Sequence, residues 1–337
     1  MVIADRPESM LGNALGGMDF DPYLYRVEMP LSAEFFPLGF PVRVRTNSVE
    51  VLAAAEESWG SFAQEFRTPT IQMNVGVQQT DATECPAAPG CRARRHLMMR
   101  IADPDNFYAA DLMQGYSLVW LTSAAVAHRS YLRYHFLESA ALCHIANRYS
   151  APVHAGCVER HGRGVLLCGD SGAGKSSLSF ACARAGWTYI TDDASFVLHA
   201  REDRRVVGNC HTVRFRPSAA NLFAEVAGRP VTPRAVGKPS IELATASVAE
   251  MRTANSAQID FVVFLNRGDT NVREVTPFAR DTARRYIHKH LCGMEELRAQ
   301  QLASVERLLS AEVVELRYRD LDWAAARLER LVEGGRL

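Results

Sequence analysis

The sequence lacks an excess of charge of either sign, and it lacks a long apolar run. Lys plus Arg and Asp plus Glu each number 38 among 337 residues. Such a balanced chain has no overall field with which to hold a polyanion, so we expect neither nucleic acid nor a membrane as a partner. No window reaches the roughly 18 uninterrupted apolar residues of a membrane span, and residues 1–10 lack a basic stretch followed by an apolar one. We therefore expect a cytoplasmic protein.

Regularly spaced cysteines are also missing. The eight cysteines stand at irregular intervals in a chain that is too long to need disulfide staples. Cys85 and Cys91 are separated by five residues, whereas structural zinc sites use about two to four, so these cysteines do not predict a zinc site with His96. We expect free thiols in a reducing compartment.

The length and the apolar content of 47% allow two domains, each with its own core. Residues 1–22 carry Gly, Pro, Asp and Met without periodicity, and we interpret them as a loose leader. The boundary between the domains is expected near Ser150. This division gives a smaller α+β N-terminal domain over residues 23–150 and a second domain over residues 151–337.

The N-terminal domain shows the patterns of short strands and of two helices. Asn47, with Glu50 three residues later, resembles a capping box that opens a helix. A longer apolar face predicts a second helix over residues 130–147. Alternation predicts strands at 70–77, 97–101 and Tyr116–Thr122.

The second domain has the rhythm of a βαβ unit. An apolar strand over residues 165–168 leads into a glycine-rich loop, and a helix then runs from Lys175 to about residue 185. Gly186 ends this helix, and a strand follows over residues 187–191. A hairpin with a turn at residues 161–164 is expected before the loop. Later runs predict strands at 196–199 and 261–265, and helices at 281–309 and 323–332.

The glycine-rich loop fits a phosphate-binding pattern. Glycines let the backbone curl so that successive N–H groups point at phosphate oxygens, and the positive end of the following helix adds to them. Lys175 would reach the outer phosphates, and Ser176 would offer its hydroxyl to Mg²⁺. The alternative is a tight strand-to-helix turn with an incidental lysine. The nucleotide-binding residues would be Gly169, Asp170, Ser171, Gly172, Ala173, Gly174, Lys175, Ser176 and Ser177.

Two aspartates follow the next predicted strand. Asp192 and Asp193 stand where an acid is needed to hold Mg²⁺ or to accept a hydroxyl proton during phosphoryl transfer. Neighbouring residues of a strand point to opposite faces, so the two carboxylates should serve different roles. A helix or turn cap is the plainer alternative, and the spacing does not say which aspartate does what. His154 lies ahead of the hairpin, where a histidine is more typical of a surface or packing position.

From His154 to Asp193 the chain resembles the catalytic core of the bacterial HPr kinase/phosphorylase family. The points of resemblance, at matching spacing, are His154, Gly162, Gly164, the loop from Gly169 to Ser176, Gly186 and the pair Asp192-Asp193. The resemblance implies an α/β fold with a P-loop kinase core similar to that of phosphoenolpyruvate carboxykinase. It also implies a ring-like homo-oligomer.

The resemblance further implies a role for each matching residue. Asp193 would accept the proton of a serine with help from His154, while Lys175 and Ser176 would bind phosphate and Mg²⁺. The metal ligands would then be Ser176, Asp192 and Asp193. The resemblance weakens after Asp193: the family's Glu-Ile-Arg-Gly segment and its phosphorolysis motif have no match, and residues 1–150 do not resemble its regulatory domain. HPr itself and reverse phosphorolysis are therefore disfavoured.

Phosphoryl transfer normally uses a cation to stabilise the negative charge that develops on the transferring phosphoryl group. Arg214, Arg216 and Lys238 are candidates by their chemistry. We prefer Lys238 as a catalytic residue, because Gly237-Lys238 lies in an otherwise apolar segment after a loop. The alternative is a surface lysine.

These features predict transfer of the terminal phosphoryl group from ATP, with Mg²⁺, to a hydroxyl on a serine of a protein or peptide. Two alternatives stay open. One is a small-molecule kinase, and the other is a nucleotide-binding regulatory module without transfer activity. The expected partner is therefore a protein, a peptide or a small-molecule hydroxyl acceptor.

Overall fold

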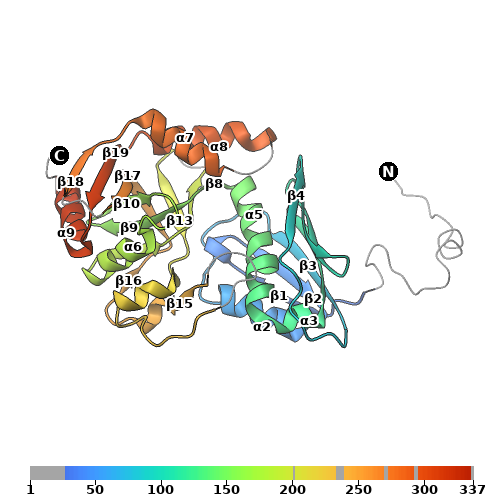
Figure 1. Ribbon diagram of the computed structural model, residues 1–337. Coiled ribbons are helices and arrows are strands. Elements are labelled where there is room, and N and C mark those ends of the chain that lie inside the picture. The colour runs from blue at the N-terminus through green and yellow to red at the C-terminus, as the bar shows by residue number, and fades with distance from the viewer. Residues whose placement is uncertain (1–26, 200–201, 233–238, 269–271, 292–294, 335–337) are drawn as a thin grey trace, which may run out of the picture.

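Two large sheets organise the chain in a mixed α/β fold (Figure 1). The computed structural model describes residues 27–199, 202–232, 239–268, 272–291 and 295–334. The first sheet lies in residues 27–149, here called the first part, and the second sheet lies in residues 150–334, the second part. The leader expected over residues 1–22 and the candidate Lys238 lie outside the described residues, and the division into domains stays a prediction.

The first sheet has seven strands in the order β1-β2-β3-β7-β6-β5-β4. β2, β3 and β7 run parallel to one another, and the remaining neighbours are antiparallel. The strand predicted over Tyr116–Thr122 is β7 with the same bounds. The other strands are β1 (Leu31–Phe35), β2 (Val42–Thr46), β3 (Ile71–Gln78), β4 (Gly90–Arg94), β5 (Leu97–Asp103) and β6 (Asn106–Asp111).

Helices of the first part pack on the buried face of this sheet. The helix α2 (Val49–Trp59) connects β2 to β3. The capping box predicted for it is wrong, because the Asn47 side chain bonds instead to the backbone of Val77 on β3, at 2.9 Å. The remaining elements are η1 (Pro37–Gly39), α3 (Ser123–Ala127), α4 (Arg129–Tyr131), the π-helix η2 (Leu132–Leu137) and α5 (Glu138–Arg148).

The second sheet branches at the long strand β17 (Ser256–Arg267). The start of β17 pairs antiparallel with β13, whereas its later residues pair in parallel with β10 on one side and β19 on the other. One branch therefore reads β16-β11-β9-β10-β17-β19-β18, and the other reads β17-β13-β12-β8. The strands are β8 (Ser150–Val153), β9 (Ala155–Arg160), β10 (Arg163–Cys168), β11 (Thr188–Thr191), β12 (Ser195–Leu198), β13 (Arg205–Gly208), β16 (Arg252–Thr253), β18 (Glu274–Pro277) and β19 (Glu312–Tyr318).

The βαβ unit around the loop is present with one strand inserted. β10, the helix α6 (Lys175–Arg184) and β11 follow one another as predicted. However, β9 lies between β10 and β11 and runs antiparallel to both. The turn between β9 and β10 is only His161-Gly162, with φ of 54° and 74°, because Arg163 already pairs with β9. Two residues with positive φ are the usual requirement of such a tight hairpin.

Helices cover both faces of the second sheet. Alternate residues of β10 point to opposite sides, toward α6 and α9 (Leu321–Val332) on one face and toward α7 (Arg280–His290) and α8 (Glu295–Leu308) on the other. The prediction of a single helix over 281–309 is wrong, because this stretch contains the two separate helices α7 and α8. No helix in the described part of the chain combines the length and apolarity needed to cross a bilayer.

A small two-stranded sheet completes the second part beside α6. It consists of β14 (Thr212–Phe215) and β15 (Ile241–Ala244), and the 3-10 helix η3 (Pro217–Asn221) follows β14. A second 3-10 helix, η4 (Thr245–Ser247), follows β15. Side chains of α6, β14 and β15 share one apolar cluster. The position of β14 is therefore tied to the helix that leaves the loop.

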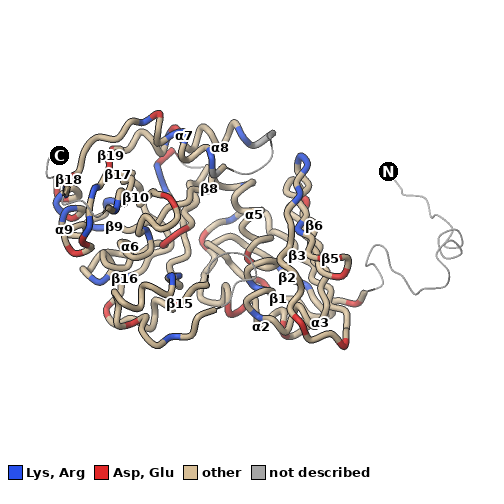
Figure 2. Tube along the Cα trace, in the orientation of Figure 1, with Lys and Arg blue, Asp and Glu red and all other residues tan. Residues whose placement is uncertain are grey.

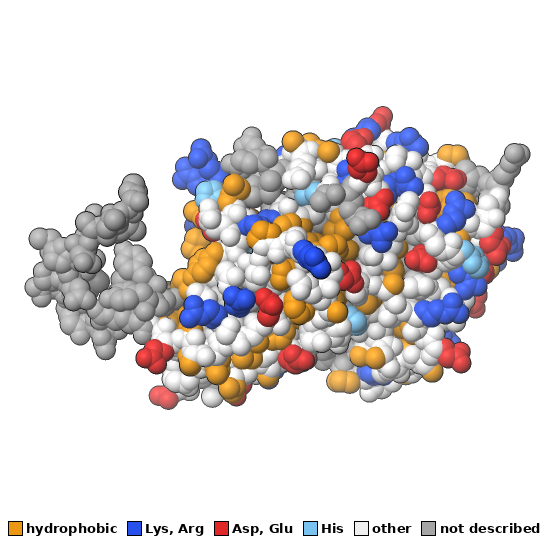
Figure 3. Space-filling view, turned by 180° about the vertical axis from the view of Figure 1, so that it is seen from behind, with side chains coloured by type: hydrophobic (Ala, Val, Ile, Leu, Met, Phe, Trp, Pro, Cys, Tyr) orange, Lys and Arg blue, Asp and Glu red, His pale blue; other side chains and the backbone are white. Residues whose placement is uncertain are grey.

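Charges of both signs are spread along both parts of the chain (Figure 2). Seen from behind, the surface carries apolar side chains scattered among charged ones (Figure 3). The seven cysteines that the structure describes are free thiols, as expected.

The packing of α6 on β14 can be tested at Phe180. Its fully buried ring lies edge-on to Phe215 and Phe223, with centroids 5.2 and 4.9 Å away. We expect Phe180→Ala to lower the free energy of unfolding by about 3–5 kcal/mol, because the loss of a buried ring leaves a cavity. Urea denaturation followed by circular dichroism measures the change. The control Leu222→Ala removes a side chain that is 45% exposed and should stay within about 0.5 kcal/mol; equal stabilities would contradict the packing.

Candidate active site

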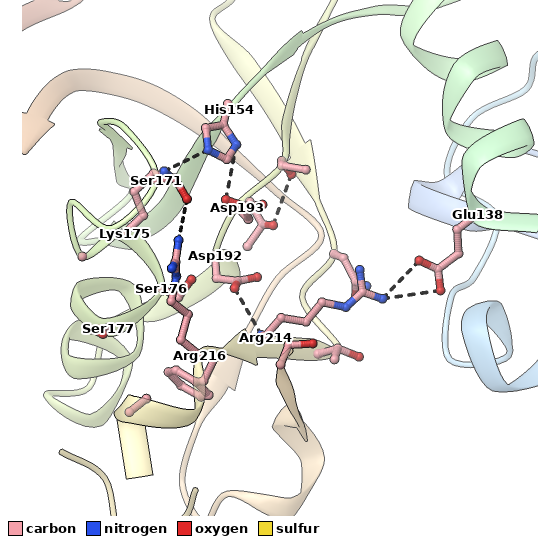
Figure 4. A pocket seen from close by; sticks show the side chains of 18 of the residues that line it. Glu138, His154, Ser171, Lys175, Ser176, Ser177, Asp192, Asp193, Arg214 and Arg216 are labelled. Atoms are coloured by element: carbon pink, nitrogen blue, oxygen red, sulfur yellow. Dashed lines mark hydrogen bonds and ion pairs between the residues drawn. The ribbon is translucent and has the colours of Figure 1, made fainter. Parts of the chain in front are cut away.

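A cavity of about 560 Å³ lies between the glycine-rich loop and the helices of the first part. The second part contributes loop residues, the two aspartates and the end of β14, and the first part contributes the facing wall (Figure 4). Residues of the first part that line the cavity are Pro37, Leu38, Ser58, Trp59, Phe62, Glu138 and Leu142.

The loop turns sharply from β10 into α6 through left-handed glycines. Gly172 and Gly174 both have φ of 100°, a conformation that residues with a side chain rarely adopt. A Cβ atom on Gly174 would also lie 2.5 Å from the hydroxyl of Tyr318, and this hydroxyl donates to the carbonyl of Ala173 at 3.1 Å. The start of α6 therefore lies at the cavity, with the free N–H groups and positive dipole end of a helix N-terminus.

Lys175, His154 and Asp193 form a line of contacts beside this loop (Figure 4). Lys175 Nζ lies 3.0 Å from His154 Nε2, and His154 Nδ1 lies 3.3 Å from Asp193 Oδ1. An ammonium can only donate, so we assign the ring proton to Nδ1, from which it points to Asp193. Lys175 Nζ also donates to the carbonyl of Gly169 at 2.7 Å. Burial lowers the pKa of Lys175, and the nearby charge of Asp193 opposes this shift.

The two aspartates point to different environments, although both lie in a bend of the chain that follows the end of β11 rather than in the strand itself. Asp192 is only 6% exposed, whereas the side chain of Asp193 is 58% exposed. Burial, followed by the charge of Asp193, raises the pKa of Asp192 to about 6. Asp192 accepts from the backbone N–H of Arg214 at 3.1 Å and forms a hydrogen bond with Ser176. This hydroxyl and carboxylate are adjoining hard oxygen donors, which fit Mg²⁺.

Arg214 joins the two parts of the chain through carboxylates. Its guanidinium lies 3.1 Å from Glu138 of α5 and 2.7 Å from Glu242 of β15, and it stacks 4.4 Å from the ring centre of Tyr134. Burial alone would lower the pKa of Arg214, but these carboxylates outweigh burial and hold it above its ordinary value. The charge of Arg214 is therefore neutralised by its neighbours.

Arg216 is the second of the three cation candidates. It leaves the end of β14 and donates to the hydroxyl of Ser171 in the loop at 2.6 Å. Its side chain lines the cavity and is exposed.

Two site residues carry no pattern in the sequence. Tyr286 of α7 accepts from the N–H of Gly169 at 3.1 Å and donates to its carbonyl at 2.7 Å, which holds the start of the loop. Glu138 binds Arg214, which lies 76 residues later. Glu138 stands among apolar and polar residues alike in its helix, so nothing around it marks it as a site residue. Nothing around Tyr286 separates it from a core aromatic residue.

A further group of possible metal ligands lies outside the cavity. His161 of the hairpin turn, Glu329 of α9 and Glu333 just after α9 have ligand atoms within 4.8 Å of one another. Glu329 is already paired with Arg160 at 2.7 Å. These residues are therefore unconnected with the cavity described above.

Comparisons with known proteins add little to this geometry. The sequence matches no protein-family model and no curated protein. Among solved structures, it is similar to the Hpr(Ser) kinase/phosphatase from Coxiella burnetii, with a TM-score of 0.31 and 12% identity. The match covers 55% of this chain and 99% of that one. A likeness this low carries no argument about activity, which must be inferred from the site.

The raised pKa of Asp192 predicts a pH-dependent stability. Its folded pKa of about 6 exceeds an unfolded value near 4, so the folded state binds the proton more strongly. The resulting stability is present at low pH and is lost as the pH rises through 6. We expect wild type to lose about 2 kcal/mol relative to Asp192→Asn between pH 4.5 and 7.5.

Urea denaturation of both proteins with EDTA present measures this difference. The asparagine keeps the shape and an oxygen that accepts from Arg214, so it removes the titration without opening a cavity. A difference in stability that does not change between the two pH values would show that Asp192 is ionised throughout.

Proposed function

We propose that this protein is an ATP- and Mg²⁺-dependent kinase that transfers the terminal phosphoryl group to a hydroxyl on a serine of a protein or peptide. The observation that carries the proposal is the line from Lys175 to Asp193 through His154, with steps of 3.0 and 3.3 Å. A cation suited to phosphate and a carboxylate suited to a hydroxyl proton thus meet in one cavity.

Catalysis in this proposal rests on positioning and charge. The N–H groups at the start of α6 and the ammonium of Lys175 hold the phosphates. The acceptor oxygen bonds to the terminal phosphorus while the bond from that phosphorus to the bridging oxygen of ADP breaks. The hydroxyl proton passes to the carboxylate of Asp193, which the Nδ1–H of His154 orients. Ser176 and Asp192 would hold Mg²⁺, which would supply positive charge for the phosphate oxygens.

The acceptor in this proposal lies against the wall formed by the first part. Leu38, Trp59 and Leu142 give this wall an apolar character, and Ser58 and Glu138 add polar groups. Mostly apolar walls with a few polar groups are typical of ligand sites. The N-terminal domain over residues 23–150 would thus select the acceptor, and residues 151–337 would bind the nucleotide.

A small-molecule acceptor is the second candidate. The observation that favours it is the cavity volume of about 560 Å³, which falls within the range of small-molecule pockets, about 300–1,000 Å³. The homo-oligomer and the cytoplasmic location stay predictions.

Labelled ATP tests the proposed transfer and its acceptor. The wild-type protein, incubated with Mg²⁺, γ-labelled ATP and a lysate of peptides and metabolites, should move label to a polypeptide. Label on a metabolite would support the second candidate, and label in water alone or nowhere would overturn the proposal of a kinase.

Lys175→Ala should abolish transfer and greatly weaken nucleotide binding, because it removes the loop's cation. Unchanged turnover in this variant would contradict the assignment of the loop and Lys175 as the phosphate-binding site.

Asp193→Asn separates proton acceptance from nucleotide binding. An amide cannot accept the hydroxyl proton, so we expect turnover to fall by about 10²–10⁴-fold, with the Kd for Mg-ATP changed less than about threefold. Calorimetric titration and the labelled assay measure the two quantities. Asp105→Asn is the matched control, because Asp105 is exposed and does not line the cavity. A parallel loss of binding and turnover would make Asp193 a metal or folding residue instead.

A further inference from the structure

The side chain of Arg216 extends to the loop from a stretch of backbone that neighbouring contacts hold in place. The residue before it, Phe215, packs edge-on against Phe180 of α6 at 5.2 Å. Two residues earlier, the N–H of Arg214 donates to Asp192 at 3.1 Å. The base of the Arg216 side chain is thus fixed to the helix that starts at the loop and to the buried aspartate. Its guanidinium reaches the Ser171 hydroxyl, 2.6 Å away (Figure 4).

Arg216 differs from the neighbouring arginines in that no carboxylate neutralises its charge within the described part of the chain. Arg214 is paired with Glu138 and Glu242, and Arg133 is paired with Glu57, Glu138 and Glu242. Within the described ranges, Arg216 has no carboxylate within ion-pair distance, and its only polar contact is the neutral hydroxyl of Ser171. An unneutralised guanidinium at a helix N-terminus and a glycine loop is suited to bidentate binding of a phosphate group.

Arg267 is the rival cation at the same cavity. It ends β17 and lines the cavity from the side of Gly174 and Tyr318. Its Cδ lies 3.6 Å from the place that a Cβ of Gly174 would take, so it borders the start of α6. Arg216 instead reaches Ser171, the residue three positions before Gly174. The two arginines therefore approach the loop at different points.

We propose that Arg216 is the side chain that contacts the terminal phosphoryl group and neutralises the charge developing on it. The inference rests on the proposed function and assigns the cation that phosphoryl transfer requires. Arg216 exchanges no proton, since a guanidinium stays charged. Its hydrogen bond to Ser171 gives way to a charge-assisted bond with the phosphoryl oxygens, which is the stronger of the two.

Nucleotides that differ by the terminal group test this contact without knowledge of the acceptor. The wild type, Arg216→Ala and Arg216→Lys are titrated calorimetrically with Mg-ADP and with Mg-AMP-PNP, a non-hydrolysable ATP analogue. We expect Arg216→Ala to weaken AMP-PNP binding by about 10- to 100-fold and ADP binding by less than about threefold. Arg216→Lys should recover part of the loss. Release of labelled phosphate from ATP should fall by about 10²–10³-fold in Arg216→Ala.

Arg184→Ala is the matched control, because Arg184 lies on α6 outside the cavity and pairs with Glu225 at 3.3 Å. It should leave both affinities unchanged. Equal changes for the two nucleotides in Arg216→Ala, or no change, would overturn the assignment while leaving the loop as the nucleotide site. A loss selective for AMP-PNP in Arg267→Ala alone would move the role to Arg267. A wild type that binds neither nucleotide would overturn the proposed function, and this inference with it.

Discussion

The sharp turn from β10 into α6 is the constraint on which the site depends. Left-handed glycines make the turn possible, and the hydroxyls of Tyr318 and Tyr286 hold its two ends by hydrogen bonds to Ala173 and Gly169. Because the turn ends at Lys175, the ammonium of Lys175 reaches His154, and Ser176 meets Asp192. A side chain at Gly174 would collide with Tyr318, so the positions of Lys175 and Ser176 both depend on the conformation of this turn.

A charged contact at the cavity links the two parts of the chain, each of which is built around its own sheet. Glu138 crosses from α5 to Arg214, and the backbone of Arg214 holds Asp192. One strand, β14, therefore touches both the first part and the buried carboxylate. The apolar core of the first part also extends onto Phe196 and Leu198 of β12. The facing wall of the cavity is thus held in place by a charged contact and by packing.

Local patterns in the sequence predicted the loop, the helix after it and the aspartates at the end of β11, since each depends on neighbouring residues. The order of the strands could not be predicted from such patterns, because the position of β9 between β10 and β11 depends on pairing between distant segments. β14 was missed because it is four residues long and half polar. Tyr286 lies 117 residues from the loop that it holds, and no spacing rule reaches so far.

The inserted strand β9 determines which chain segments lie beside the glycine turn. In an all-parallel sheet, each strand begins at the edge opposite to the one where its neighbours end. β9 runs against its neighbours, so its first residue, Ala155, pairs with Cys168, the last residue of β10. The segment entering β9 is thereby delivered to the exit of β10, and it brings His154 there. Reversing a single strand therefore places an imidazole from upstream of the glycine turn beside that turn, without a long connecting segment.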